Sequence, residues 1–169
     1  LILKSLKKFY SDDSNYEELY KIINTNSSVS LRLIDWFVTN YSKKYNTIYL
    51  FDKDNKEITD DLKANIIQIN VFQEYKSQLK AFSKKRFDPF CRRERIDFIC
   101  NDKEVNTTIG QLNFFKWAIS NRVIDYIKKN KDMIEDDMNF SLKVTKDTCK
   151  KNKNGRKSRQ ELSKSALRG

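Results

Sequence analysis

A chain of 169 residues is long enough to bury a sizeable hydrophobic core within one domain. Its formal net charge is +11, it has three Cys without paired spacing, and it has no His. This composition excludes Ser-His-Asp and Cys-His nucleophile sites and argues against a zinc site and a disulfide framework. No apolar run approaches the roughly 18 residues of a membrane span, so we expect no membrane segment. Because the usual ligand and nucleophile patterns are missing, we also expect no cofactor, no bound metal and no enzymatic activity.

The first half of the chain predicts two helices followed by strands. Residues 14–24 predict a helix with Ser14 as its N-cap. Apolar residues at three- and four-residue spacing predict a second helix within residues 27–46. Residues 47–51 predict a short strand. Residues 65–72 are ambiguous: their β-branched side chains favour a strand, whereas the helical pattern that follows them favours the start of the next helix.

The second half predicts a helix, a hairpin and a longer helix. The first helix begins near Asn70, which is a suitable N-cap, and Pro89 stops it. Hydrophobicity alternates on both sides of a polar turn in residues 93–110, which predicts a β-hairpin. Thr108 lies where an N-cap is needed for a helix that occupies residues 111–129.

These elements predict an α+β fold: a helix-rich single domain with a small antiparallel β-hairpin or sheet and a basic C-terminal tail. The hydrophobic periodicity stops beyond Phe140, where Lys, Asn, Ser and Arg dominate. Such a composition buries too little apolar area to offset the entropy of ordering, so we expect residues 146–160 to be flexible when nothing is bound. We place the globular domain at residues 1–145 and the tail at residues 146–169.

The positive charge is unevenly distributed. Residues 141–169 hold ten Lys or Arg and two acidic residues, a balance of +8, which leaves +3 for residues 1–140. The 25 Lys and 16 Asn fit a preference for AT-rich codons, which would need no functional explanation. The nine Arg are more informative, because seven of them fall within residues 86–95 and 156–168. Forked guanidinium groups suit phosphate, so this clustering indicates an anionic partner.

Basic residues also recur along the helix that begins near Asn70. Lys76, Lys80 and Lys84 have i,i+4 spacing, where like charges cost roughly a few tenths of a kcal/mol per pair, a cost that a bound polyanion would remove. Further basic residues follow along the chain as far as the start of the predicted hairpin. The predicted nucleic-acid-binding surface comprises Lys76, Lys80, Lys84, Lys85, Arg86, Arg92, Arg93 and Arg95, with Arg156, Lys157 and Arg159 as an auxiliary arm.

Several features have alternative interpretations. Phe87 and Phe90 fit base-stacking residues or residues that anchor the Pro89 turn to the core, and anchoring is the commoner role. Gln111 and Asn113, on the expected outward face of the helix at residues 111–129, are types that read base edges, although any amphipathic helix shows such a face. The basic residues also fit a solvated surface, a contact with acidic protein or, at residues 150–160, a nuclear-localisation signal.

Four segments of the chain resemble uncharacterised proteins of nucleocytoplasmic large DNA viruses, the group that includes giant amoebal, algal and iridescent viruses: "SLRLIDWFVTNYSKK", "YKSQLKAFSKKRFDPFCRRERIDF", "TTIGQLNFFKWAISNRVIDYI" and "RKSRQELSKSA". The resemblance covers residues 28–166 and implies no particular activity. It implies expression in an infected cell, with localisation in the host cytoplasm or the virion, or alternatively the host nucleus. It also implies that the protein continues past this chain into a further apolar segment.

We therefore expect a viral protein that binds the phosphate backbone of DNA or RNA without strong sequence preference. The alternative is a structural virion or assembly protein whose basic surface contacts acidic core or capsid proteins. A magnesium-dependent nuclease is a third hypothesis. Its acidic pairs at residues 12–13, 60–61 and 135–136 are explained equally well by helix capping.

Overall fold

The computed structural model describes residues 1–62 and 65–155, with side chains to residue 149. The chain divides into two compact units, Leu1–Ile134 and Glu135–Gly169. The boundary between domain and tail at residue 145 stays a prediction. Residues 146–155, which we expected to be flexible, continue a helix that no Pro or Gly interrupts before Gly155. The remainder of the predicted tail, residues 156–169, lies outside the described residues.

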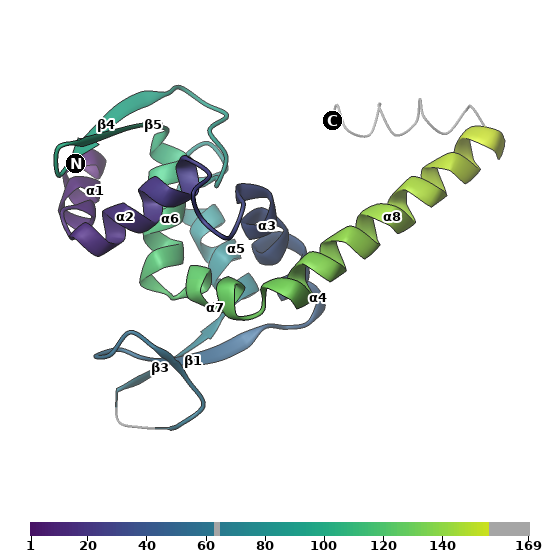
Figure 1. Cartoon of the computed structure of the whole chain (residues 1–169), viewed down its shortest axis with the longest axis horizontal. Coiled ribbons are helices and arrows are strands. Elements are labelled where there is room, and N and C mark those ends of the chain that lie inside the picture. The colour runs from purple at the N-terminus through teal and green to yellow at the C-terminus, as the bar shows by residue number, and fades with distance from the viewer. Residues whose placement is uncertain (63–64, 156–169) are drawn as a thin grey trace. The chain divides into compact units, whose positions relative to one another are not determined.

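Figure 1 shows helices and two small sheets in the first unit. The elements in chain order are α1 (Ile2–Tyr10), α2 (Asp13–Ile23), α3 (Leu31–Trp36), the π-helical turn η1 (Phe37–Tyr41), α4 (Ser42–Lys44), β1 (Ile48–Asp52), β2 (Ile58–Thr59), β3 (Ile66–Asn70), α5 (Val71–Phe82), β4 (Ile96–Cys100), β5 (Lys103–Thr107), α6 (Ile109–Ser120), α7 (Val123–Lys129) and α8 (Lys131–Gly155). The predicted helix-rich α+β fold with small antiparallel sheets is confirmed.

Both sheets are antiparallel. The first has the strand order β2-β1-β3, and the second is the β4–β5 hairpin, in which Phe98 pairs with Val105. The hairpin turns at Asn101 and Asp102, whose φ angles of 52° and 61° are those that a tight type I′ turn requires. The predicted strand and hairpin are therefore present, and the ambiguous residues 65–72 form β3 and then enter α5.

Side-chain caps set the start of the longer helices. Asn70 and Thr108 each accept a hydrogen bond from the backbone N–H three residues later, at 3.2 and 3.0 Å, so both predicted caps are confirmed. The prediction that Ser14 caps α2 is wrong. Asp12 is the N-cap, because its carboxylate accepts hydrogen bonds from both the N–H and the hydroxyl of Ser14. Helix α2 consequently begins at Asp13.

Helix α6 is the central helix of the first unit and packs against α1, α2 and α7. It is buried on almost every side, from Gly110 to Ile119. The predicted single helix over residues 111–129 is wrong, because α6 ends at Ser120 and Arg122 adopts a left-handed conformation with φ of 58°. The Asn121 side chain donates to the carbonyl of Trp117 at 2.9 Å and so competes with helix continuation.

Candidate nucleic-acid interface

The basic residues after α5 lie in a loop. Helix α5 ends at Phe82, because Ser83 takes a left-handed φ of 63° and its N–H bonds back to the Leu79 carbonyl. Arg86 N–H then donates to the Ser83 carbonyl at 3.2 Å and closes a turn. The prediction that the helix carries Lys84 and runs on to Pro89 is therefore wrong. We call residues 83–95, which connect α5 to β4, the basic loop.

Phe87 anchors the basic loop to the core. Its side chain is 1% exposed, and its ring centroid lies 5.2 Å from that of Phe114 and 5.7 Å from that of Trp117. The Phe82 ring stacks on it at 6.0 Å with an interplanar angle of 9°. The anchoring interpretation of Phe87 is confirmed, and the ring is not accessible to a base. Phe90 is half-buried beneath the Arg92 guanidinium, which lies 4.7 Å from the ring centroid.

Two buried amides of α6 bind the backbone of the basic loop. Gln111 Nε2 donates to the Pro89 carbonyl at 2.8 Å, and Asn113 Nδ2 donates to the Arg86 carbonyl at 2.9 Å. Gln111 is 1% exposed and Asn113 is 7% exposed, so the prediction that they face outward is wrong. Their polarity satisfies loop carbonyls that would otherwise be buried without a partner. Helix α6 therefore cannot present these residues to a DNA groove.

Gly110 permits this close contact between α6 and the loop. A Cβ atom at this position would lie 3.2 Å from the Lys85 carbonyl oxygen and 3.4 Å from two further backbone atoms. The Gly110 carbonyl also accepts a hydrogen bond from the Asp88 N–H at 3.2 Å. The loop backbone is thus fixed at several points along its length.

The cationic side chains of the predicted surface lie on α5 and on the basic loop. All eight that lie within the described residues are exposed. Among the described residues, Arg92 is the member of this set that forms an ion pair, with Asp88 at 3.1 Å. The other seven are Lys76, Lys80, Lys84, Lys85, Arg86, Arg93 and Arg95. Arg156, Lys157 and Arg159 lie outside the described residues, so the proposed auxiliary arm is not placed.

Two hollows flank the basic loop and bring most of its cations together. The first, of about 410 Å³, is lined by Lys84, Arg92 and Arg93. The second, of about 490 Å³, is lined by Lys85, Arg86 and Arg93, by the acidic Glu94, and by apolar side chains of α1, β4 and α6. Arg93 borders both hollows. Lys76, Lys80 and Arg95 border neither of them.

The first hollow also contains acidic groups. Asp35 of α3 and Asp88 both line it. Burial raises the pKa of the Asp35 carboxyl, and the nearby Arg92 opposes that shift. Burial also raises the pKa of Tyr75, in the same hollow, to about 12. The first hollow therefore has two carboxylates beside its three cations, whereas the second has one, Glu94, and is better suited to phosphate.

Sequence reasoning missed one cation that the fold adds to this side of the protein. Lys43 of α4 and Lys76 of α5 each place Nζ 5.6 Å from the centroid of the Phe72 ring. Helices α4 and α5 are in contact, which brings together residues that are far apart in the sequence. The periodicity within one helix could not reveal this pairing.

Two further findings concern other kinds of site. Within residues 1–62 and 65–155, no group of three or more His, Cys, Asp or Glu side chains is arranged to hold a metal ion. In the same described part of the chain, no helix combines the length and apolar character needed to cross a membrane.

The chain belongs to a family of unknown function, DUF7197, which it matches over residues 1–168. It is 42% identical over 166 residues to an uncharacterised protein, L507, of Acanthamoeba polyphaga mimivirus. The match covers 94% of this chain and 58% of that relative, so the chain spans little more than half of the viral protein's length. No solved structure matches the chain. The resemblance to uncharacterised proteins of large DNA viruses is confirmed.

Proposed function

We propose that this protein binds nucleic acid through the phosphate backbone, with the basic loop as its principal contact surface. The observation that carries the proposal is a loop fixed to the core by Phe87, Gln111 and Asn113 while its cations stay exposed and, except for Arg92, without ion pairs among the described residues. Clustered charges without partners repel one another, and phosphates would relieve that repulsion.

The anchored backbone is the second support for this proposal. A flexible basic segment loses conformational entropy when it binds, whereas a loop that is already fixed loses less. Arg and Lys contacts to phosphate carry no base preference, so the binding is expected to be insensitive to sequence. The release of counterions would make it fall steeply with salt.

The test is a salt series with a charge-reversal variant. Lys85 and Arg93 are the best targets, because they line the second hollow and neither is paired within the described chain, unlike Arg92. The variant Lys85→Glu/Arg93→Glu should weaken binding to random-sequence DNA and RNA and reduce the slope of log K against log salt by about 2. The matched control is Lys21→Glu/Lys53→Glu, which changes the net charge equally at exposed positions on α2 and after β1.

If both variants lose affinity equally, net charge rather than the basic loop is responsible. If neither loses affinity, the proposed surface is wrong. A role in virion assembly, through contacts of the basic surface with viral proteins, is the second candidate function. The first hollow favours it, because Asp35 and Asp88 lie beside three cations there and this mixture of charges suits protein side chains of both signs better than phosphate. That role requires viral protein partners that remain bound after nuclease treatment, and their loss on digestion would count against it.

A further inference from the structure

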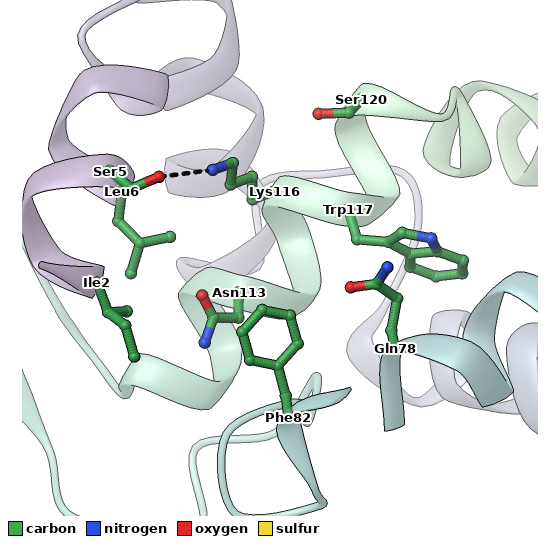
Figure 2. Close-up of a pocket in the computed structure, with 9 residues that line it drawn as sticks. All are labelled: Ile2, Ser5, Leu6, Gln78, Phe82, Asn113, Lys116, Trp117 and Ser120. Carbon is green, nitrogen blue, oxygen red and sulfur yellow. Dashed lines mark hydrogen bonds between the residues drawn. The ribbon is translucent and has the colours of Figure 1, made fainter. Parts of the chain in front are cut away.

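A third cavity lies next to the basic loop, between α1, α5 and α6. Its volume is about 300 Å³, at the lower end of the range for small-ligand pockets. Phe82, the last residue of α5, and Trp117 of α6 supply aromatic surface, and Ile2 and Leu6 of α1 form its apolar wall. Figure 2 shows these side chains around the opening. The cavity therefore suits a flat, largely apolar body.

Two amides give this cavity a polar side. Gln78 and Asn113 both line it, and in Figure 2 the Phe82 ring stands between them. Asn113 Nδ2 donates to the Arg86 carbonyl, so Asn113 Oδ1 is available as an acceptor. The Gln78 amide forms no hydrogen bond within the described part of the chain. An amide offers a donor and an acceptor side by side, the pattern found on the edges of nucleobases.

The cavity also adjoins cations suited to phosphate. Lys116 lines it and is held in place by the hydrogen bond from its Nζ to Ser5 Oγ at 2.9 Å. Ile2 borders both this cavity and the second hollow, where Lys85 and Arg86 lie. A strand whose phosphates contact those two residues would therefore have the cavity within reach of its bases.

We propose that this cavity receives one unstacked base of a single-stranded nucleic acid whose backbone lies on Lys85 and Arg86. The inference rests on the proposed function and narrows it to single strands, because the bases of a duplex are stacked and paired and cannot enter. The base stacks on the half-buried Phe82 ring next to Trp117, which is 6% exposed, and its polar edges bond to Gln78 and Asn113. Because every base has a π-face, stacking of this kind tolerates different sequences.

The experiment compares a short single strand with an abasic strand of the same length, using fluorescence. The chain has two Trp, so Trp36→Phe leaves Trp117 as the reporter. The base-bearing strand should bind about tenfold more tightly than the abasic strand and quench Trp117, whereas the abasic strand should not quench it. Gln78→Ala should reduce this tenfold difference, and Phe82→Ala should abolish it. Gln73→Ala, an exposed change on the same helix, should leave it intact.

Three outcomes would overturn the inference. Equal, salt-dependent binding of both strands without quenching would show that the cavity is not used, while the proposed function would stand. A tenfold difference that survives both Gln78→Ala and Phe82→Ala would place the base elsewhere. If neither strand binds at low salt, the proposed function fails, and the base site fails with it. Phe82→Ala removes a half-buried ring that stacks on Phe87 in the core, so the fold of this variant is checked by circular dichroism. If it is unfolded, Gln78→Ala carries the test.

Discussion

Replacing Gln111 by Met tests whether its side chain holds the basic loop against α6. Met has a similar volume but supplies neither a strong donor nor a strong acceptor. The substitution removes the 2.8 Å bond to the Pro89 carbonyl and the 2.7 Å bond that Gln111 Oε1 accepts from the Thr107 hydroxyl. Both bonds are buried. A buried polar group left without a partner costs about 1–3 kcal/mol. The Thr107 hydroxyl keeps a weaker contact with the Thr108 carbonyl at 3.5 Å, so its loss lies at the low end, and together the two losses should lower the free energy of unfolding by about 2–4 kcal/mol.

Urea denaturation followed by circular dichroism measures this loss. With a slope of about 2 kcal/mol per M, the midpoint should fall by about 1–2 M. Hydrogen exchange adds a local readout, since the Asp88 N–H that bonds to Gly110 should lose protection. Gln73→Ala, an exposed change, should alter the free energy of unfolding by less than about 0.5 kcal/mol. A change of similarly small size in Gln111→Met would refute the argument that this amide fixes the loop.

Two further predictions concern the ring and the carboxylate nearest the loop. Phe87→Ala should lower the free energy of unfolding by about 3–5 kcal/mol in urea denaturation, because a ring that is 1% exposed leaves a cavity; a loss below about 1 kcal/mol would show that the ring is not part of the core. Asp35→Asn should stabilise the protein at neutral pH, since burial raises the folded-state pKa of this carboxyl above its ordinary 3.8 and penalises its charged form. In thermal melts the advantage should shrink as pH falls through the folded pKa and vanish below 3.8, where both states are protonated. An advantage that is independent of pH would contradict the assigned cause.

Local signals in the sequence were sufficient for much of the fold. The caps at Asn70 and Thr108 are short-range hydrogen bonds, and the β4–β5 hairpin follows from alternation around a turn. These features depend on residues a few positions apart. Helix α1 was not predicted, although Leu6 and Tyr10, four residues apart on one face, are both buried and give the signal that would have found it.

The errors arose where distant residues decide the structure. Gln111 and Asn113 look like surface residues on a helical face, but their partners are the Pro89 and Arg86 carbonyls, 22 and 27 residues away. The end of α5 at Phe82 similarly depends on the burial of Phe87 against Phe114. The hydrophobic periodicity of one segment does not reveal contacts with a distant segment. The basic residues could therefore be identified from the sequence, but the buried side chains that hold the basic loop in place could not.

The hydrogen bonds from α6 to the basic loop predict that a buried substitution affects the proposed interface. Because Gln111 of α6 holds the Pro89 carbonyl, the positions of Lys85 and Arg93 depend on a side chain that is 1% exposed and contacts neither proposed ligand site. Under the proposed function, Gln111→Met should therefore weaken nucleic-acid binding in conditions where the protein stays folded, since a released loop loses entropy on binding. Its salt slope should match that of the unmodified protein, because no phosphate contact has been removed. Lys85→Glu/Arg93→Glu should show the opposite combination, with a reduced slope and an unchanged urea midpoint.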